Sequence, residues 1–117
     1  ARLFDAYRQF YGQPGDLARA RDWLRERLRF GESVVLVASR GGKVAGFAQL
    51  YPMYSSVRTA RTWILNDLFV DPDARRGGVG RTLLAAAAQF ARAVQRLPLA
   101  QSICAVERVS ESPEAAE

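Results

Sequence analysis

Histidine is absent from this 117-residue chain, and cysteine, lysine and methionine each occur only once. Without histidine, neither a Ser-His nor a Cys-His catalytic pair can be assembled. A single cysteine, Cys104, allows no internal disulfide and no cysteine-histidine zinc cluster. The sequence therefore predicts no bound metal and no mechanism that depends on an imidazole.

The chain also lacks a long hydrophobic run. A membrane-spanning helix needs about 20 apolar residues, whereas the best run here, Leu83 to Ala88, ends at Gln89 and is flanked by Arg81 and Arg92. The segment that begins at Ala1 has no signal-peptide pattern and no initiator methionine, so we expect a trimmed start. These absences predict a protein without a membrane span or a secretion signal, and a cytoplasmic location.

What is present is typical of one folded domain, with 49% hydrophobic and 25% charged residues. Basic residues outnumber acidic residues 17 to 12, and 16 of the 17 are arginine. Residues 107–117 carry a net charge of −3 and are too polar to pack, so we expect a disordered acidic tail after a single domain over residues 1–106. The remaining +8 attracts polyanions such as nucleic acid or a phosphate-rich cofactor, although dispersed arginines are also typical of an arginine-favouring genome.

Hydrophobic spacing predicts two helices followed by a hairpin. Apolar residues three and four apart predict a first helix over residues 3–11, and a second helix from the N-cap Asp16 to about Phe30. Two Val-rich runs, residues 33–39 and 44–54, are joined through a Gly-Gly turn. Such a pattern predicts two antiparallel strands.

A third strand is expected over residues 62–70, antiparallel to the second. Both of its faces are largely apolar, so we expect it to be central in the sheet and covered on each side. A helix is predicted from Leu83 to about Arg96, and residues 97–106 are expected to return as a strand parallel to the third by a right-handed crossover. Alternation places Ile64, Asn66, Leu68 and Val70 on one face of the third strand, and Trp63, Leu65, Asp67 and Phe69 on the other.

A loop rich in glycine and arginine, residues 75–81, lies between the third strand and the last helix. Successive backbone amides at the positive end of a helix dipole bind phosphate, and the glycines let the backbone approach an anion closely. No Lys-Ser or Lys-Thr follows the glycines, which excludes a Walker loop. Leu83 stands where a Rossmann loop needs its third glycine or alanine. A different phosphate loop remains, with an ordinary strand-to-helix turn as the alternative.

The run from Asn66 to Leu84 resembles the central strand, pyrophosphate loop and helix of the GCN5-related N-acetyltransferase (GNAT) family. The family signature is Arg or Gln, two residues, Gly, one residue, then Gly or Ala, and Arg75, Gly78 and Gly80 meet it. The resemblance covers about residues 3–100. It implies an α/β (α+β) fold with a mixed, mostly antiparallel central sheet flanked by helices, lacking the family's first strand and its C-terminal helix and strands. Open sheet edges predict a homodimer.

The resemblance implies that acetyl-coenzyme A is the cofactor and that an acceptor amine, on a small molecule or a protein, attacks the thioester directly. Such a ternary-complex reaction needs no nucleophilic side chain, which agrees with the absence of histidine. The pyrophosphate would lie on the loop, and the pantetheine arm would pair with strand backbone. The cofactor-binding residues predicted in this way are Leu68, Phe69, Val70, Arg75, Arg76, Gly77, Gly78, Val79, Gly80 and Arg81.

Asp67 is the candidate catalytic carboxylate, either removing the amine proton through a water molecule or holding the ammonium group. The alternative is that it caps a loop or pairs with an arginine such as Arg61. Asn66, Tyr51 and Tyr54 are candidate acceptor-binding residues, although aromatic residues at a strand end often serve packing alone. The family often protonates the leaving thiol with a late tyrosine, but no tyrosine follows Tyr54.

Two other functions stay open from the sequence. The absence of a late tyrosine favours a degenerate protein that binds acyl-coenzyme A without turnover. The arginines also suggest a basic nucleic-acid-binding module, but those of the second helix, such as Arg19, Arg25 and Arg29, occupy the polar face of an amphipathic helix. We therefore expect no specific nucleic-acid partner.

Overall fold

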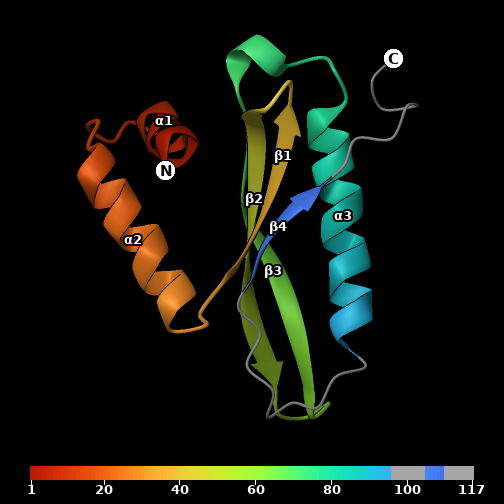
Figure 1. Ribbon diagram of the computed structural model, residues 1–117. Coiled ribbons are helices and arrows are strands. Elements are labelled where there is room, and N and C mark those ends of the chain that lie inside the picture. The colour runs from red at the N-terminus through yellow and green to blue at the C-terminus, as the bar shows by residue number, and fades with distance from the viewer. Residues whose placement is uncertain (96–104, 110–117) are drawn as a thin grey trace.

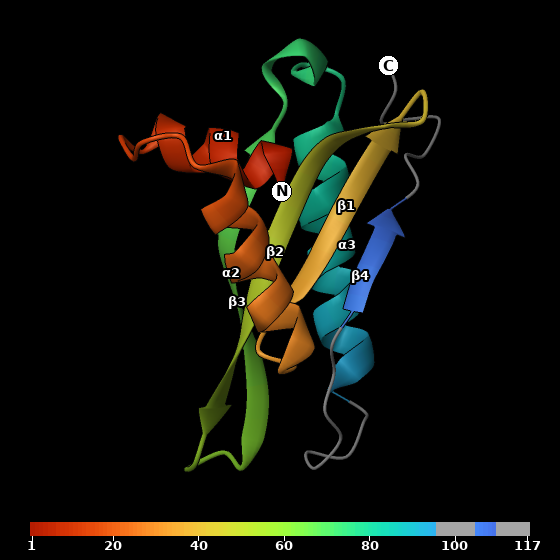
Figure 2. The same cartoon turned by 60° about the vertical axis from the view of Figure 1, so that its left-hand side comes forward.

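The computed structural model describes residues 1–95 and 105–109. The described elements form a four-stranded sheet in the order β3-β2-β1-β4, in which β2 runs antiparallel to both of its neighbours, β1 and β3 (Figure 2). This confirms the mixed, mostly antiparallel sheet flanked by helices. In chain order the elements are α1 (Arg2–Phe10), α2 (Leu17–Arg29), β1 (Val34–Arg40), β2 (Lys43–Ser55), β3 (Ala60–Val70), the 3-10 helix η1 (Pro72–Ala74), α3 (Val79–Val94) and β4 (Ala105–Val109).

The helices cover both faces of the sheet, with α1 and α2 on one face and α3 on the other (Figure 1). The predicted N-cap of α2 is confirmed, because the Asp16 carboxylate accepts a hydrogen bond of 3.0 Å from the Arg19 amide. Each face has its own apolar core. Val34, Leu36, Leu50, Val79, Leu83 and Phe90 are among the residues packed on the α3 face, and Leu3, Phe4, Ala20, Val35, Phe47 and Phe69 pack on the other. Within the described residues, no helix is long and apolar enough to cross a bilayer.

The third strand differs from its prediction in two ways. It is the edge strand of the described sheet, and it contains a β-bulge, because Gln49 pairs with Asp67 whereas Leu50 pairs with Leu65. The extra residue, Asn66, reverses the alternation of side chains. Trp63 therefore packs against α3, with its ring 5.2 Å from that of Phe90, instead of sharing a face with Asp67. The prediction that side chains alternate without interruption between the two faces over residues 62–70 was therefore wrong for the residues before the bulge.

The last strand also differs from its prediction. β4 pairs in parallel with β1, so the expected pairing with the third strand is wrong. It begins at Ala105 and continues to Val109, beyond the predicted end at residue 106. Within the described residues, no strand pairs with the outer edge of β3. The remaining residues of the predicted strand, 97–104, and of the predicted tail, 110–117, lie outside the described part of the chain.

Close packing of α3 on β2 depends on Gly46. A Cβ atom at this position would lie 2.9 Å from Cγ1 of Val79, 3.1 Å from the Phe69 carbonyl oxygen and 3.2 Å from Cδ1 of Leu83. Val79 is the first residue of α3, so this contact sets where the helix begins relative to the sheet.

Gly46→Ala is expected to destabilise the fold by about 1–3 kcal/mol, because the added methyl group overpacks the contact between β2 and α3. Urea unfolding followed by circular dichroism measures this change. Gly15→Ala is the matched control, since its Cβ would meet only the flexible Gln9 side chain, and about 0.5 kcal/mol or less is expected. Equal stability of the two variants would contradict the packing argument.

Candidate functional site

Asp71 ends β3 and fixes the start of the loop that follows. Its carboxylate accepts a hydrogen bond of 3.0 Å from the Asp73 amide and lies 3.3 Å from the guanidinium group of Arg2. The backbone hydrogen bond from Asp73, assisted by Arg2 and opposed by burial, lowers the pKa of Asp71 below its usual value. The carboxylate thus stays ionised at neutral pH and holds the turn of η1 in place.

The glycine-arginine loop turns sharply into α3. Arg76 and Gly78 both have positive φ angles, 70° and 82°, and Gly78 is the N-cap without a side-chain hydrogen bond to cap the helix. The first helical hydrogen bond runs from the Thr82 amide to the Gly78 carbonyl, over 2.9 Å. The amides of residues 79–81 precede it and so have no acceptor within the helix. Amides of this kind, at the positive end of a helix dipole, can donate hydrogen bonds to an anion.

Four arginines surround this loop. Arg75 donates to the Val70 carbonyl over 3.1 Å, and its guanidinium group lies 5.4 Å from the centre of the Phe69 ring. The side chains of Arg76 and Arg81 are exposed. From the end of β1, Arg40 donates to the Gly77 carbonyl over 2.8 Å. A Cβ atom at residue 77 would overlap that guanidinium group, so glycine is needed there for this contact.

A cavity of about 330 Å³ opens between α1 and the end of β3. Because β3 is the edge strand, the cavity lies beside backbone that no described strand covers. Arg75 links it to the glycine-arginine loop. A larger cavity of about 520 Å³ under α1 and α2 is mainly apolar, and no residue of the loop lines it. The residues that line the smaller cavity are Tyr7, Phe10, Tyr11, Leu68, Phe69, Val70 and Arg75.

Asp67 lies next to this cavity as the end of a buried hydrogen-bonded chain. Its Oδ2 accepts from Nε2 of Gln49 over 2.8 Å, and Oε1 of Gln49 accepts from the Ser33 hydroxyl over 2.9 Å. Its Oδ1 accepts from Nδ2 of Asn66 over 3.0 Å. Tyr7 makes a further side-chain hydrogen bond to Asp67. The candidate carboxylate therefore has a defined orientation on the face that carries α1 and α2.

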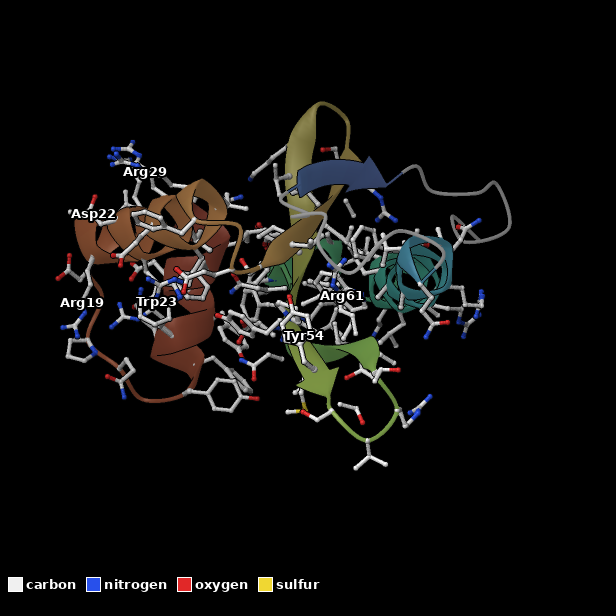
Figure 3. The ribbon with its side chains drawn as sticks, turned by 90° about the horizontal axis from the view of Figure 1, so that it is seen from below. Arg19, Asp22, Trp23, Arg29, Tyr54 and Arg61 are labelled. Carbon is white, nitrogen blue, oxygen red and sulfur yellow. The ribbon has the colours of Figure 1, made fainter. Side chains whose placement is uncertain are left out.

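The structure brings Tyr51 to this face but not Tyr54. Tyr51 shares a hydrogen bond with Trp23 of α2, and burial, with a smaller contribution from Asp67, raises the pKa of Tyr51 above its usual value. Tyr54 lies three residues further from Asp67 along the hairpin and contacts Arg61, whose guanidinium group is 5.9 Å from its ring (Figure 3). By the two-residue period of β2, Tyr54 shares the α3 face with Leu50.

The sequence missed three residues of the site. Tyr7 was assigned to the apolar face of a helix, Gln49 was taken as one more strand residue, and Arg40 as part of a turn. Tyr7 and Gln49 contact Asp67, and Arg40 contacts the loop. For Gln49, the sequence offered one indication: an amide side chain in an otherwise apolar strand is expected to be buried and to need a polar partner. Nothing local distinguishes Tyr7 or Arg40.

Comparisons with known proteins agree with this arrangement. The acetyltransferase (GNAT) family model matches residues 1–104. An uncharacterized N-acetyltransferase of Bacillus subtilis, YhfO, is 52% identical over 91 residues, covering 78% of this chain and 61% of that protein. A probable acetyltransferase of Haemophilus influenzae is 37% identical over 94 residues, covering 80% of this chain and 64% of that protein. The chain thus spans about three fifths of the length of these curated relatives.

Solved structures show the same fold. The crystal structure of a probable acetyltransferase superimposes with a TM-score of 0.74 at 36% sequence identity, over 97% of this chain and 72% of that one. The glycine-arginine loop, β3 and the helices all lie within residues 1–104, which the family model matches. By its sequence match and its fold, the chain belongs to the GNAT family of acetyltransferases.

Proposed function

We propose that this chain is an N-acetyltransferase that moves the acetyl group of acetyl-coenzyme A to a primary amine. The observation that carries the proposal is the continuity of the site. An anion-binding loop at the start of α3 leads directly, through Arg75, into a cavity beside the exposed edge of β3. A long cofactor with a diphosphate group at one point and a thioester at its end fits such a path.

The residues of the loop suit a diphosphate. Gly80 leaves space above the first turn of α3, since a Cβ atom there would meet only Cγ2 of Val70, at 3.7 Å. The amides of residues 79–81 point along the helix axis toward the anion, and Arg75, Arg76 and Arg81 supply formal charge. We propose that the pantetheine arm then pairs with the backbone of residues 68–70 at the edge of the sheet, as an added strand does.

Three requirements remain for the acetyl transfer: a neutral amine, a stabilised oxyanion and a protonated leaving thiol. Asp67 is proposed as the carboxylate that receives the amine proton, because it is the acidic residue beside the cavity and is held in one orientation. A backbone amide near Phe69 is proposed to donate to the oxyanion. The acceptor is an amine on a small molecule or a protein, and Tyr51 and Asn66, which flank Asp67, are proposed to contact it.

A degenerate acyl-coenzyme A-binding protein without turnover is the second candidate. Such a protein would bind the cofactor with the same loop and cavity. Only the release of free coenzyme A in the presence of an amine distinguishes it from an active N-acetyltransferase. A nucleic-acid-binding function gains no support from the arrangement of α2, where the acidic Asp22 lies on the same outer side of the helix as Arg19 and Arg29 (Figure 3). The cytoplasmic location stays a prediction.

Gly80→Leu is expected to weaken binding of acetyl-coenzyme A at least tenfold, or about 1.4 kcal/mol, because the side chain would cover the amides of the first turn. Isothermal titration calorimetry measures the change. The control is Ala88→Leu, which adds the same side chain at an exposed position of α3 two turns further on. Unchanged affinity of the Gly80 variant, or no binding by the unmodified chain, would refute the proposed site.

Asp67→Asn is expected to lower kcat by about 10²- to 10⁴-fold, the range for loss of a general base, and to change the Kd for acetyl-coenzyme A less than twofold. Release of free coenzyme A with a panel of primary amines measures turnover. Asp73→Asn, on an exposed carboxylate, is the control. If the Asp67 variant loses cofactor affinity and keeps its turnover number, Asp67 does not have the proposed role.

A homodimer is proposed because uncovered sheet edges favour pairing between copies. Among the described residues, β4 and the part of β3 before the bulge, residues 60–65, have no outer partner strand and lie away from the edge proposed for the cofactor. Size-exclusion chromatography with light scattering is expected to give twice the chain mass of 13.0 kDa. A species of 13.0 kDa at all concentrations would contradict the dimer.

A further inference from the structure

Asp67 is separated from the cavity that it would serve. Asp67 is only 5% exposed. It is not among the described residues that line the cavity. Both carboxylate oxygens already accept hydrogen bonds from amide groups, one from Gln49 and one from Asn66. An amine bound in the cavity would therefore need an intermediary to reach this carboxylate.

Tyr7 occupies the position between them. Its side chain lines the cavity, and it makes a side-chain hydrogen bond to Asp67. Edge-to-face contacts fix the ring, whose centre lies 5.8 Å from that of Phe47 and 6.0 Å from that of Phe69. Tyr11, on the next turn of α1, adds a third ring at 5.1 Å. These contacts hold the ring, and with it the hydroxyl group, between the cavity and Asp67.

We propose that Tyr7 is the catalytic residue that contacts the acceptor amine and relays its proton to Asp67. The inference rests on the proposed N-acetyltransferase function and deepens it. It assigns Asp67 to the end of the relay, where it acts through Tyr7. Gln49 and Ser33 become positioning residues, because their hydrogen bonds orient the carboxylate toward the tyrosine.

The raised pKa of Tyr7 favours a relay over a phenolate base. Burial raises the pKa of Tyr7 well above its usual value, and the hydrogen bond to Asp67 and the negative charge of that residue raise it further. Tyr11 and Tyr51 act in the same direction. The phenol therefore keeps its proton at neutral pH. It accepts a proton only as it gives its own to Asp67.

The proton balance of the step is complete. One proton leaves the ammonium nitrogen for Oη of Tyr7 while the hydroxyl proton of Tyr7 passes to Asp67, so that the tyrosine stays neutral and the carboxylate becomes a carboxylic acid. The nitrogen lone pair then forms the amide C–N bond as the C–S bond of the thioester breaks and its electron pair leaves on sulfur. The second proton lost by nitrogen ends on that sulfur, giving a thiol.

Tyr7→Phe tests the relay, because it keeps the ring contacts and removes only the hydroxyl group. We expect kcat to fall about 10²-fold, the low end of general acid-base effects, with the Kd for acetyl-coenzyme A changed less than twofold. Loss of the hydrogen bond to Asp67 is expected to lower the melting temperature by a few degrees, so turnover is compared at a temperature at which both proteins are folded. Ser56→Ala removes an exposed hydroxyl group from the turn between β2 and β3 and should keep full turnover. A Tyr7 variant as active as the unmodified chain would overturn the relay and leave a water molecule as the intermediary.

A second measurement does not depend on turnover. In protein labelled with ¹³C at the tyrosine ζ carbon, the signal absent from Tyr7→Phe is expected to titrate well above the other three tyrosines, and to move toward them in Asp67→Asn. If the pKa of Tyr7 equals that of the other tyrosines, or does not change in Asp67→Asn, the contact that the relay requires is absent and the relay is wrong.

The outcomes separate the two proposals. If the unmodified chain does not bind acetyl-coenzyme A, or releases no coenzyme A with any amine, the proposed function fails and the relay with it. If the unmodified chain turns over, Asp67→Asn is inactive and Tyr7→Phe is fully active, the function stands and the relay alone is wrong. If Asp67→Asn does not fold, the turnover of Tyr7→Phe and the pKa of Tyr7 in the unmodified chain still test the relay.

Discussion

One extra residue in β3 determines how the rest of the site is arranged. Because Asn66 bulges from the ladder, the residues before it and after it face opposite ways. Trp63 joins the core under α3, and Asp67 turns toward the face that carries α1 and α2. Without the bulge, the indole and the carboxylate would share one face. A large apolar ring would then compete with the polar chain for the same space.

The polar chain in turn limits what can lie on that face. Ser33 lies directly before β1, and Gln49 and Asp67 lie in the neighbouring strands β2 and β3. Each of the three is almost completely buried. Buried polar groups are costly unless they are hydrogen-bonded, so this chain is stable only while all its members are in register. The register of the sheet therefore also fixes the orientation of the candidate catalytic carboxylate, Asp67.

Much of the architecture is local and could be predicted from the sequence. The three helices follow from apolar spacing, the start of α2 from Asp16, and the hairpin of β1 and β2 from its Gly-Gly turn. The glycine-arginine loop is also local, because its charges, glycines and following helix are contiguous. The family was identifiable from this loop alone, and Asp67 was recognisable as a carboxylate in an apolar strand.

By itself the sequence determined the three helices, the first three strands, the place of the glycine-arginine loop and the candidate carboxylate Asp67, since each depends on neighbours within a few residues. Only the tertiary structure decided that β3 is an edge strand, that β4 pairs with β1, and that Tyr7 and Arg40 belong to the site. Tyr7 lies 60 positions from Asp67, and Arg40 lies 37 from Gly77. Contacts at such separations leave no periodic trace in the chain, because they arise from how the sheet twists and how the helices pack upon it.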